Sequence, residues 1–288
     1  MSVSSALELI ESVAETSVLF VGDTIIDEYH YVTPLGKSPK EHLIPVEYCD
    51  KEVFAGGIEA AAAHARTFCK TVDISTSGPI TRKVRLVDKA YLRKLFEIHY
   101  NGQSVENPRP ITTGYDCIVL ADFGHGAVTR ETMRDIYASG TYLALDVQTN
   151  SANIGFNLVT KYRKADYIVI DEPEARLAAA DRDGPIEDVV KRLATGRCKK
   201  MVVTLGNRGA IGYENGQFYR APAMSKNVVD VMGAGDAFFA VTAPMARTGS
   251  MDDLLLIGNA AGALKTQIVG HRESVTKEKL IGFISQNP

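Results

Sequence analysis

The segment DVMGAGDAF, residues 230–238, places a carboxylate directly after a turn of small residues. Gly233, Ala234 and Gly235 precede Asp236, and an apolar run follows. At the start of a buried helix, such a turn leaves several backbone N–H groups free and aimed in one direction, which creates an anion site. An Asp at a helix start is also a common N-cap. The glycines favour a phosphate cradle with a carboxylate base, because glycine serves where a ligand approaches the backbone closely.

Phosphoryl transfer is the chemistry that these residues fit. The reaction depends on positioning and charge neutralisation more than on covalent help from the protein. The N–H groups of residues 233–235 would stabilise charge on the transferred phosphoryl group, and Asp236 would accept the proton of the attacking hydroxyl. The sequence has no GxxxxGK[ST] motif, and no GxGxxG follows its first predicted strand, which disfavours a P-loop kinase and a dinucleotide enzyme.

Asp27, Gly56 and Gly57 are candidates for the acceptor side of the site. Asp27 follows a predicted buried strand at residues 17–23, and ligands of open α/β sheets bind at the carboxyl ends of strands. A simple turn residue is the equally weighted alternative. Gly56 and Gly57 open an alanine-rich helix within residues 54–68, where a ligand can approach the backbone. Close packing of small residues explains this pair equally well.

Basic residues gather in the segment 80–99, which alternates charged and apolar positions and predicts a hairpin through residues 88–89. Lys83, Arg85 and Lys94 would form charge-assisted bonds with a phosphate already present on the substrate. The alternative is a solvated edge strand protected by its Lys and Arg side chains.

A regular order of elements must position these residues. Residues 1–17 predict an amphipathic helix rather than a signal peptide. From residue 115 onward strand and helix patterns alternate, including a predicted helix at 157–163, and this order is typical of a mostly parallel sheet with helices on both faces. Residues 101–110 predict a loop.

Two segments interrupt the α/β pattern. Residues 29–54 and 80–99 predict short, half-exposed strands. We interpret them as a small β-flap that forms a lid on the active site and excludes water from it.

Composition limits the classes of protein. The 288 residues are 45% hydrophobic with a formal net charge of -3, which predicts one α/β domain over residues 1–288. The near-neutral charge argues against nucleic-acid and membrane-surface partners. Four separated cysteines without a CxxC pair suggest neither zinc nor a redox dithiol. Without a signal peptide or an apolar run of the ~20 residues that span a membrane, we expect a cytoplasmic protein with reduced thiols.

Several segments, in this order along the chain, resemble the ribokinase-like (PfkB) sugar kinases. VGDTIID resembles the first strand of that family, AGGIEAAAAHA its glycine-containing N-terminal signature, and DVMGAGDAF its C-terminal signature DTxGAGD. The resemblance spans nearly the whole chain. It implies a ribokinase-like α/β sandwich of three layers, with a mostly parallel central sheet, helices on both faces and a small β-lid.

Within the family the chain most resembles heptose 7-phosphate kinase, through GDTIIDEYHYV, SPKEHLIPV, ITRKVRL and ADFGHGAVT. The last of these segments adds Asp122 to the expected site. With Asp23 and the residues derived above, the expected substrate-binding set is Asp23, Asp27, Gly56, Gly57, Lys83, Arg85 and Asp122. The segments VVTLGNRGAIGY and NAAGALKTQIVG imply a nucleotide-binding set of Thr204, Gly206, Gly209 and Asn259.

The resemblance also implies cofactors and an assembly. ATP is the expected phosphate donor, with Mg²⁺ held through water by Glu174 and Asp171 of DEPE, which stands where the family has NxxE. A monovalent cation such as K⁺ is a further candidate. Flaps of this family pair between subunits, which suggests a homodimer through the β-lid.

The chain departs from the family pattern mainly on the sugar side. Ala60 replaces the asparagine of the glycine signature, Gln148 replaces a lysine, and Val231 replaces the threonine after Asp230. About one αβ unit is absent between TVDIST and ITRKVRL. The leading hypothesis is therefore an ATP-dependent kinase acting on a sugar or sugar phosphate. A kinase-fold protein that binds a sugar phosphate or nucleotide without catalysis is the alternative, and an enzyme acting on a nucleoside or other alcohol is a third hypothesis.

Overall fold

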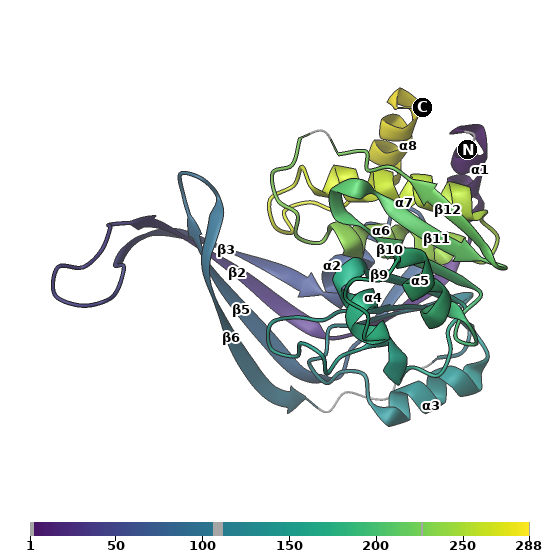
Figure 1. The fold of residues 1–288 in the computed structure, drawn as a ribbon, viewed down its shortest axis with the longest axis horizontal. Helices are drawn as coiled ribbons and strands as arrows, with labels where there is room; N and C mark the ends of the chain where they lie inside the picture. The colour runs from purple at the N-terminus through teal and green to yellow at the C-terminus, as the bar shows by residue number, and fades with distance from the viewer. Residues whose placement is uncertain (1–2, 106–111, 226, 288) are drawn as a thin grey trace.

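The computed structural model describes residues 3–105, 112–225 and 227–287 (Figure 1). Its helices are α1 Val3–Ser12, α2 Ile58–Ala65, α3 Arg130–Ser139, α4 Glu172–Ala179, α5 Ile186–Ala194, α6 Ala234–Thr242, α7 Met251–Lys265 and α8 Lys277–Gln286. Its strands are β1 Ser17–Gly22, β2 Thr24–Pro34, β3 Val46–Gly57, β4 Thr71–Ser75, β5 Gly78–Asp88, β6 Arg93–Val105, β7 Cys117–Asp122, β8 Tyr142–Val147, β9 Tyr167–Asp171, β10 Lys200–Thr204, β11 Ala210–Glu214 and β12 Gln217–Ala221.

The central sheet has eight strands in the order β12-β11-β10-β9-β8-β7-β1-β4. Neighbours from β4 to β10 run parallel, while β11 and β12 form an antiparallel edge. The interior parallel strands β1, β7 and β8 are apolar at most positions, as expected for strands that are covered on both faces. The prediction of a mostly parallel sheet is confirmed.

Alternate side chains of the central strands belong to two different cores. One core joins Phe20, Val119 and Val169 to helices α1, α2, α6, α7 and α8. The other joins Val21 and Leu120 to α3, α4 and α5. Helices therefore cover both faces of the sheet, which confirms the predicted sandwich of three layers.

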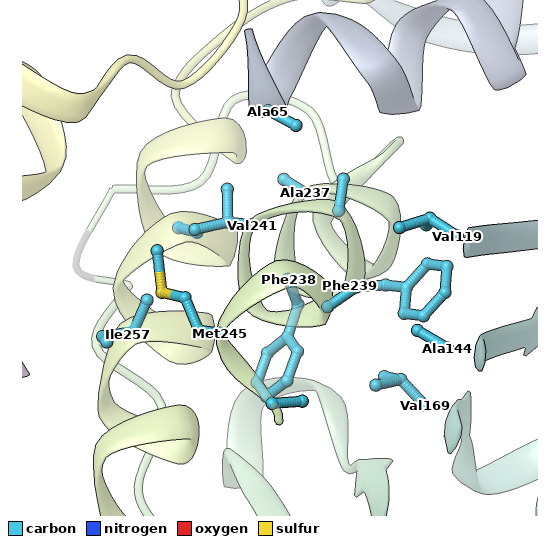
Figure 2. Close-up of a cluster of buried hydrophobic side chains, with 14 of the residues drawn as sticks. Ala65, Val119, Ala144, Val169, Ala237, Phe238, Phe239, Val241, Met245 and Ile257 are labelled. Atoms are coloured by element: carbon cyan, nitrogen blue, oxygen red, sulfur yellow. The ribbon is translucent and has the colours of Figure 1, made fainter. Parts of the chain in front are cut away.

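Helix α6 is anchored in the first of these cores. Figure 2 shows Phe239 beside Val119, Ala144 and Val169 of the central strands, and Val241 near Ile257 of α7. All five of these side chains and Phe239 are buried. The N-terminal turn of α6 is consequently held at a fixed position relative to the sheet.

A second sheet, in the order β3-β2-β5-β6, projects from the α/β body (Figure 1). Strand β2 pairs antiparallel with β3 and parallel with β5, while β5 pairs antiparallel with β6. Asp27 lies opposite Phe54 on one side and opposite Lys83 on the other. These strands and the connections between them, residues 35–45 and 89–92, contain the segments 29–54 and 80–99 that the sequence suggested for a lid.

The central sheet ends at β4, and only two residues separate β4 from β5 of the second sheet. Two local predictions were wrong. Residues 157–163 contain only the 3₁₀ turn Val159–Lys161, because the Asn157 amide donates to the carbonyls of Asp122 (3.0 Å) and Gln148 (2.9 Å). Residues 101–105 of the predicted loop continue β6, and residues 106–110 lie outside the described residues.

Within the described ranges, no helix combines the length and apolarity that crossing a lipid bilayer requires.

Candidate active site

The first turn of α6 forms the centre of the site. Gly233 is its N-cap residue, with a left-handed φ of 73° and no capping side chain. The backbone N–H groups of this turn are therefore not capped by a side chain, as an anion site requires. Asp236 lies three residues inside this end, so the alternative interpretation of Asp236 as a plain N-cap is wrong.

A cavity of about 210 Å³ opens beside this turn. It brings together six residues of the predicted site: Asp171, Glu174, Thr204, Gly233, Gly235 and Asp236. Asp146 and Gln148 also line it, from the carboxyl end of β8. The sequence indicated Gln148 only as a departure from the family pattern. Sequence reasoning missed Asp146, although this residue lies near the end of a predicted strand.

Four carboxyl groups line this cavity, and burial is the main reason why each has a raised pKa. The pKa of Asp146 lies well above its usual value, that of Glu174 is raised to about 8, and those of Asp171 and Asp236 are raised. Repulsion from neighbouring carboxylates adds to the effect on Asp146 and Glu174. Gln148 Nε2 donates to Asp146 Oδ2 at 3.1 Å and to Asp236 Oδ1. The cavity therefore favours a cation, as a Mg²⁺-phosphate complex would supply.

Glu174 and Asp171 hold each other through a capping box at the start of α4. Glu174 N donates to Asp171 Oδ1 and Asp171 N donates to Glu174 Oε2, both at 2.8 Å, while Thr149 N donates to Glu174 Oε1 at 2.9 Å. Among the described residues, no group of three or more His, Cys, Asp or Glu is arranged to hold a metal ion by itself. A role through water and substrate phosphates, as Mg²⁺ commonly adopts, fits this donor set.

The raised pKa of Glu174 predicts a pH-dependent stability difference between the wild type and Glu174→Gln. In the unfolded chain the carboxyl ionises near its ordinary pKa of 4.5, whereas in the folded chain its pKa is raised to about 8. Between these values the folded state holds a proton that the unfolded state has lost, so rising pH favours unfolding. The variant should gain stability relative to the wild type from pH 5 to 8, on the order of a few kcal/mol. Urea denaturation at several pH values would measure this.

Glu172→Gln is the matched control, because Glu172 starts the same helix but faces Arg176 and Arg208. Its stability difference from the wild type should stay constant between pH 5 and 8. If Glu174→Gln behaved in the same way as this control, Glu174 would be ionised in the folded protein at neutral pH.

The acceptor side is organised around Asp27, which is 4% exposed. Asp27 Oδ1 forms an ion pair with Arg85, and Oδ2 lies 3.4 Å from His271 Nε2. Burial raises the pKa of Asp27, but His271 and Arg85 outweigh it, so the pKa is lowered. A Cβ atom at Gly56 would overlap Asp27 Oδ2, which explains the glycine at this position. Gly57 follows as the N-cap of α2, with a φ of 57°.

Lys83 and Arg85 are 8% and 7% exposed on β5, an interior strand of the second sheet. The alternative of a solvated edge strand is therefore wrong for β5, whereas β6, which contains Lys94, is an exposed edge strand of this sheet. Burial lowers the pKa of Lys83, and this effect is partly offset by attraction to Asp27, Glu97 and Asp236. Lys83 thus interacts electrostatically with both Asp27 and Asp236.

Three residues that the sequence suggested for substrate contact form hydrogen bonds or ion pairs within the protein instead. Asp23 is 0% exposed and accepts from Phe123 N (2.9 Å) and Ala127 N (2.8 Å). Asp122 is buried, accepts from Gly124 N at 2.9 Å and pairs with Lys161. Both residues shape the loop 123–127. Lys94 pairs with Asp230 at 3.0 Å.

Of the four predicted nucleotide-side residues, Thr204 alone is among the described residues that line the cavity. Thr204 ends β10 and lines the cavity, and Gly206 and Gly209 bound the turn that follows. Asn259 of α7 donates to the carbonyls of Ala221 (3.3 Å) and Pro222 (3.1 Å), after β12.

His271 and Lys265 are two further residues that sequence reasoning missed. A Cβ atom at Gly233 would lie 3.4 Å from His271 Cε1 and 3.2 Å from Lys265 Cε. Both residues therefore pack against the first turn of α6, which the sequence predicts to be the catalytic turn. They follow Gly233 by more than thirty residues, and no local pattern connects them with it.

Comparison with known proteins reveals similarity over most of the chain. The sequence model described as "pfkB family carbohydrate kinase" matches residues 130–278, a little over half of the chain. The bifunctional protein HldE of Rhodopseudomonas palustris is 23% identical, covering 95% of this chain and 68% of the relative. HldE of Bradyrhizobium diazoefficiens is 24% identical, covering 91% of this chain and 62% of the relative.

Solved structures share the fold at low sequence identity. Ribokinase of Thermotoga maritima superposes with a TM-score of 0.69 at 16% identity, covering 94% of this chain and 99% of the ribokinase. Phosphofructokinase-2 of Escherichia coli, in complex with potassium, gives a TM-score of 0.69 at 14% identity with the same coverage of both chains.

Proposed function

The chain belongs to the pfkB family of carbohydrate kinases, and on this premise we propose that it transfers a phosphoryl group from ATP to a hydroxyl of a phosphorylated sugar. A heptose-phosphate-like acceptor is favoured by the resemblance of four segments to heptose 7-phosphate kinase. The observation that carries the proposal is the burial of Lys83 and Arg85 next to Asp27, within electrostatic reach of Asp236.

The reaction assigns separate tasks to the two sides of the site. The acceptor hydroxyl oxygen bonds to the terminal phosphorus of ATP, and the bond from that phosphorus to the bridging oxygen of ADP breaks. Asp236 accepts the hydroxyl proton, and its raised pKa suits a group that must hold a proton during the step. The N–H groups of residues 233–235 stabilise the charge of the transferred group.

Mg²⁺ and ATP would bind on the side of the cavity that the four carboxyl groups line. Glu174 and Asp171 would hold Mg²⁺ through water, and Asp146 adds a third carboxyl group beside them. When bound, the ion neutralises phosphate charge. Thr204, Gly206, Gly209 and Asn259 would contact the nucleotide.

The alternative, a binding protein without catalysis, draws on one observation. Gln148 donates to Asp236 Oδ1, which ties up one oxygen of the proposed base. The other oxygen, Oδ2, lies nearer the turn, 3.6 Å from the position of a Cβ atom at Gly233. Because one free oxygen suffices for proton transfer, we favour the enzyme.

A coupled ADP-release assay with hexoses, heptoses and their phosphates tests the proposal. We expect ADP release that depends on the acceptor and is greatest with a sugar phosphate. Ligand binding without ADP release across the whole panel would support the alternative. A rate that favours nucleosides would favour the third hypothesis.

We further propose that the second sheet forms both a lid and a dimer interface. Phe96, Ile98 and Tyr100 alternate along β6, and they are 59%, 44% and 46% exposed. They lie on the face opposite Glu97, which pairs with Arg85 at 2.6 Å. An exposed apolar row on the outer face of a sheet indicates a protein partner, and a second copy of this lid would cover it.

Replacing Phe96 and Ile98 by Asp should convert a dimer into a monomer, because two charges would be buried without partners at the interface. Light scattering coupled to size-exclusion chromatography measures the mass. Leu177→Asp is the control, since Leu177 is 40% exposed on α4, away from the lid. A monomeric wild type at assay concentrations would contradict the dimer proposal.

A further inference from the structure

Lys265, the last residue of α7, buries its ammonium group behind the catalytic turn. The residue is 0% exposed, and Nζ donates to the carbonyl oxygens of Met232 (2.8 Å) and Gly270 (2.7 Å). Both hydrogen-bond partners are uncharged main-chain groups. A buried charge is costly unless its surroundings compensate it. The two carbonyl dipoles provide part of that compensation for the Lys265 ammonium.

The same two residues are also held by their N–H groups. Asp230 Oδ1 accepts from Met232 N at 3.1 Å, and Asp230 Oδ2 accepts from Gly270 N at 3.0 Å. A carboxylate thus binds both N–H groups while an ammonium binds both carbonyls. This pair of charges clamps the segment before the catalytic turn to the segment after α7.

The clamp bears directly on the chemistry. Met232 immediately precedes Gly233, and Gly270 immediately precedes His271, which reaches Asp27. The Lys265 ammonium is also one of the charges that lower the pKa of Asp236 and so offset the effect of its burial. Burial lowers the pKa of Lys265, and attraction to Asp230 and Asp236 offsets part of this effect. The ammonium supplies a positive charge behind the N–H groups that would receive the phosphoryl group.

Backbone carbonyls are the ligands that proteins offer to K⁺, and an ammonium carries the same unit charge. The carbonyl oxygens of Met232 and Gly270 are groups beside the catalytic turn that could bind such an ion, and both already bind Lys265. Resting on the kinase function proposed above, we propose that the Lys265 ammonium serves as a built-in monovalent cation. The K⁺ expected from the family resemblance is then not required by this chain.

The wild-type protein provides the first test. ADP release is measured with K⁺, Na⁺ or tetramethylammonium as the sole monovalent cation, at equal ionic strength so that screening stays constant. We expect rates within about twofold of one another. Activation by K⁺ of about tenfold or more would overturn the proposal and leave the kinase function standing.

Lys265→Met provides the second test, because methionine keeps much of the side-chain volume but removes the charge. Without K⁺, the kcat of this variant should fall about 10- to 100-fold, because the turn loses the positive charge that supports the transferred phosphoryl group. Added K⁺ should restore kcat better than the smaller Na⁺. Lys200→Met is the matched control. Lys200 Nζ also binds two carbonyls, those of Ala246 (2.9 Å) and Gly249 (2.5 Å), but away from the site. This control should retain kcat and gain no dependence on K⁺.

Thermal stability gives a readout that is independent of catalysis. A ligand that binds the folded state raises Tm, so K⁺ should raise the Tm of Lys265→Met above its value in Na⁺ and leave that of the wild type unchanged. This result would support the proposal even if no protein released ADP, in which case only the kinase function would fail. A Lys265→Met protein whose Tm and kcat both ignore K⁺ would overturn it. Should that variant not fold, the wild-type cation series decides the question.

Discussion

Asp236→Asn should lower kcat by about 10²- to 10⁴-fold, the usual contribution of a general base. The amide has nearly the same shape as the carboxylate but cannot accept the hydroxyl proton. The fold should survive, because the surroundings of Asp236 raise its pKa and the neutral amide removes the cost of its charge. The ADP-release assay gives kcat, and the affinity for ATP, measured by calorimetry, should stay within about threefold.

Asp253→Asn is the matched control for this variant. Asp253 occupies the same place in the first turn of α7 that Asp236 occupies in α6, but it binds Ser250 and Ser5 instead of facing the cavity. Its kcat should stay near the wild-type value. An Asp236→Asn enzyme that kept a rate within tenfold of the wild type would exclude Asp236 as the base.

The general architecture could be predicted because its signals are local. Strands such as Ser17–Gly22 and Cys117–Asp122 are continuous apolar runs bounded by polar residues, and the order of strands and helices then indicates a parallel sheet. The small residues at the start of α6 predicted an anion site from a signal that is equally local. Both signals lie within a dozen residues of sequence.

The acceptor side could be predicted only in part, because its geometry depends on contacts between distant segments. Alternation suggested that Lys83 and Arg85 share a face, but their burial depends on pairing with β2 and β6. Asp23 was expected to bind substrate because it lies at a strand end. Its oxygens instead accept hydrogen bonds from N–H groups about one hundred residues further along the chain. His271 meets Asp27 across more than two hundred residues, and no spacing rule indicates such a contact.

Asp146 illustrates a different limit. Its position near the end of a strand was visible in the sequence, but so were those of several other carboxylates. Asp146 is distinguished from them because it lines one cavity together with Asp171, Glu174 and Asp236. Because that grouping arises from two strands and two helices, the cluster becomes apparent only once the sheet order is known.

Lys83→Met should raise the KM for a phosphorylated acceptor about 10- to 150-fold, since a hydrogen bond to a charged group contributes about 1.5–3 kcal/mol. The KM for the same sugar without phosphate should change less than about threefold, because the lost charge has no partner on that substrate. Stability should not fall, since burial already disfavours the charged form of Lys83 and lowers its pKa. Initial rates with both acceptors measure this difference.

Arg82→Met controls for a general loss of positive charge on β5. Arg82 is the neighbour of Lys83, but it points to the opposite face, where it pairs with Glu28 at 3.1 Å and covers the Tyr100 ring. Its KM for both acceptors should remain near the wild-type value. An equal rise of KM for both acceptors in Lys83→Met would mean that Lys83 holds the sugar rather than its phosphate. The preference for a phosphorylated acceptor would then have to come from Arg85 alone, and Arg85 is already paired with Asp27 and Glu97.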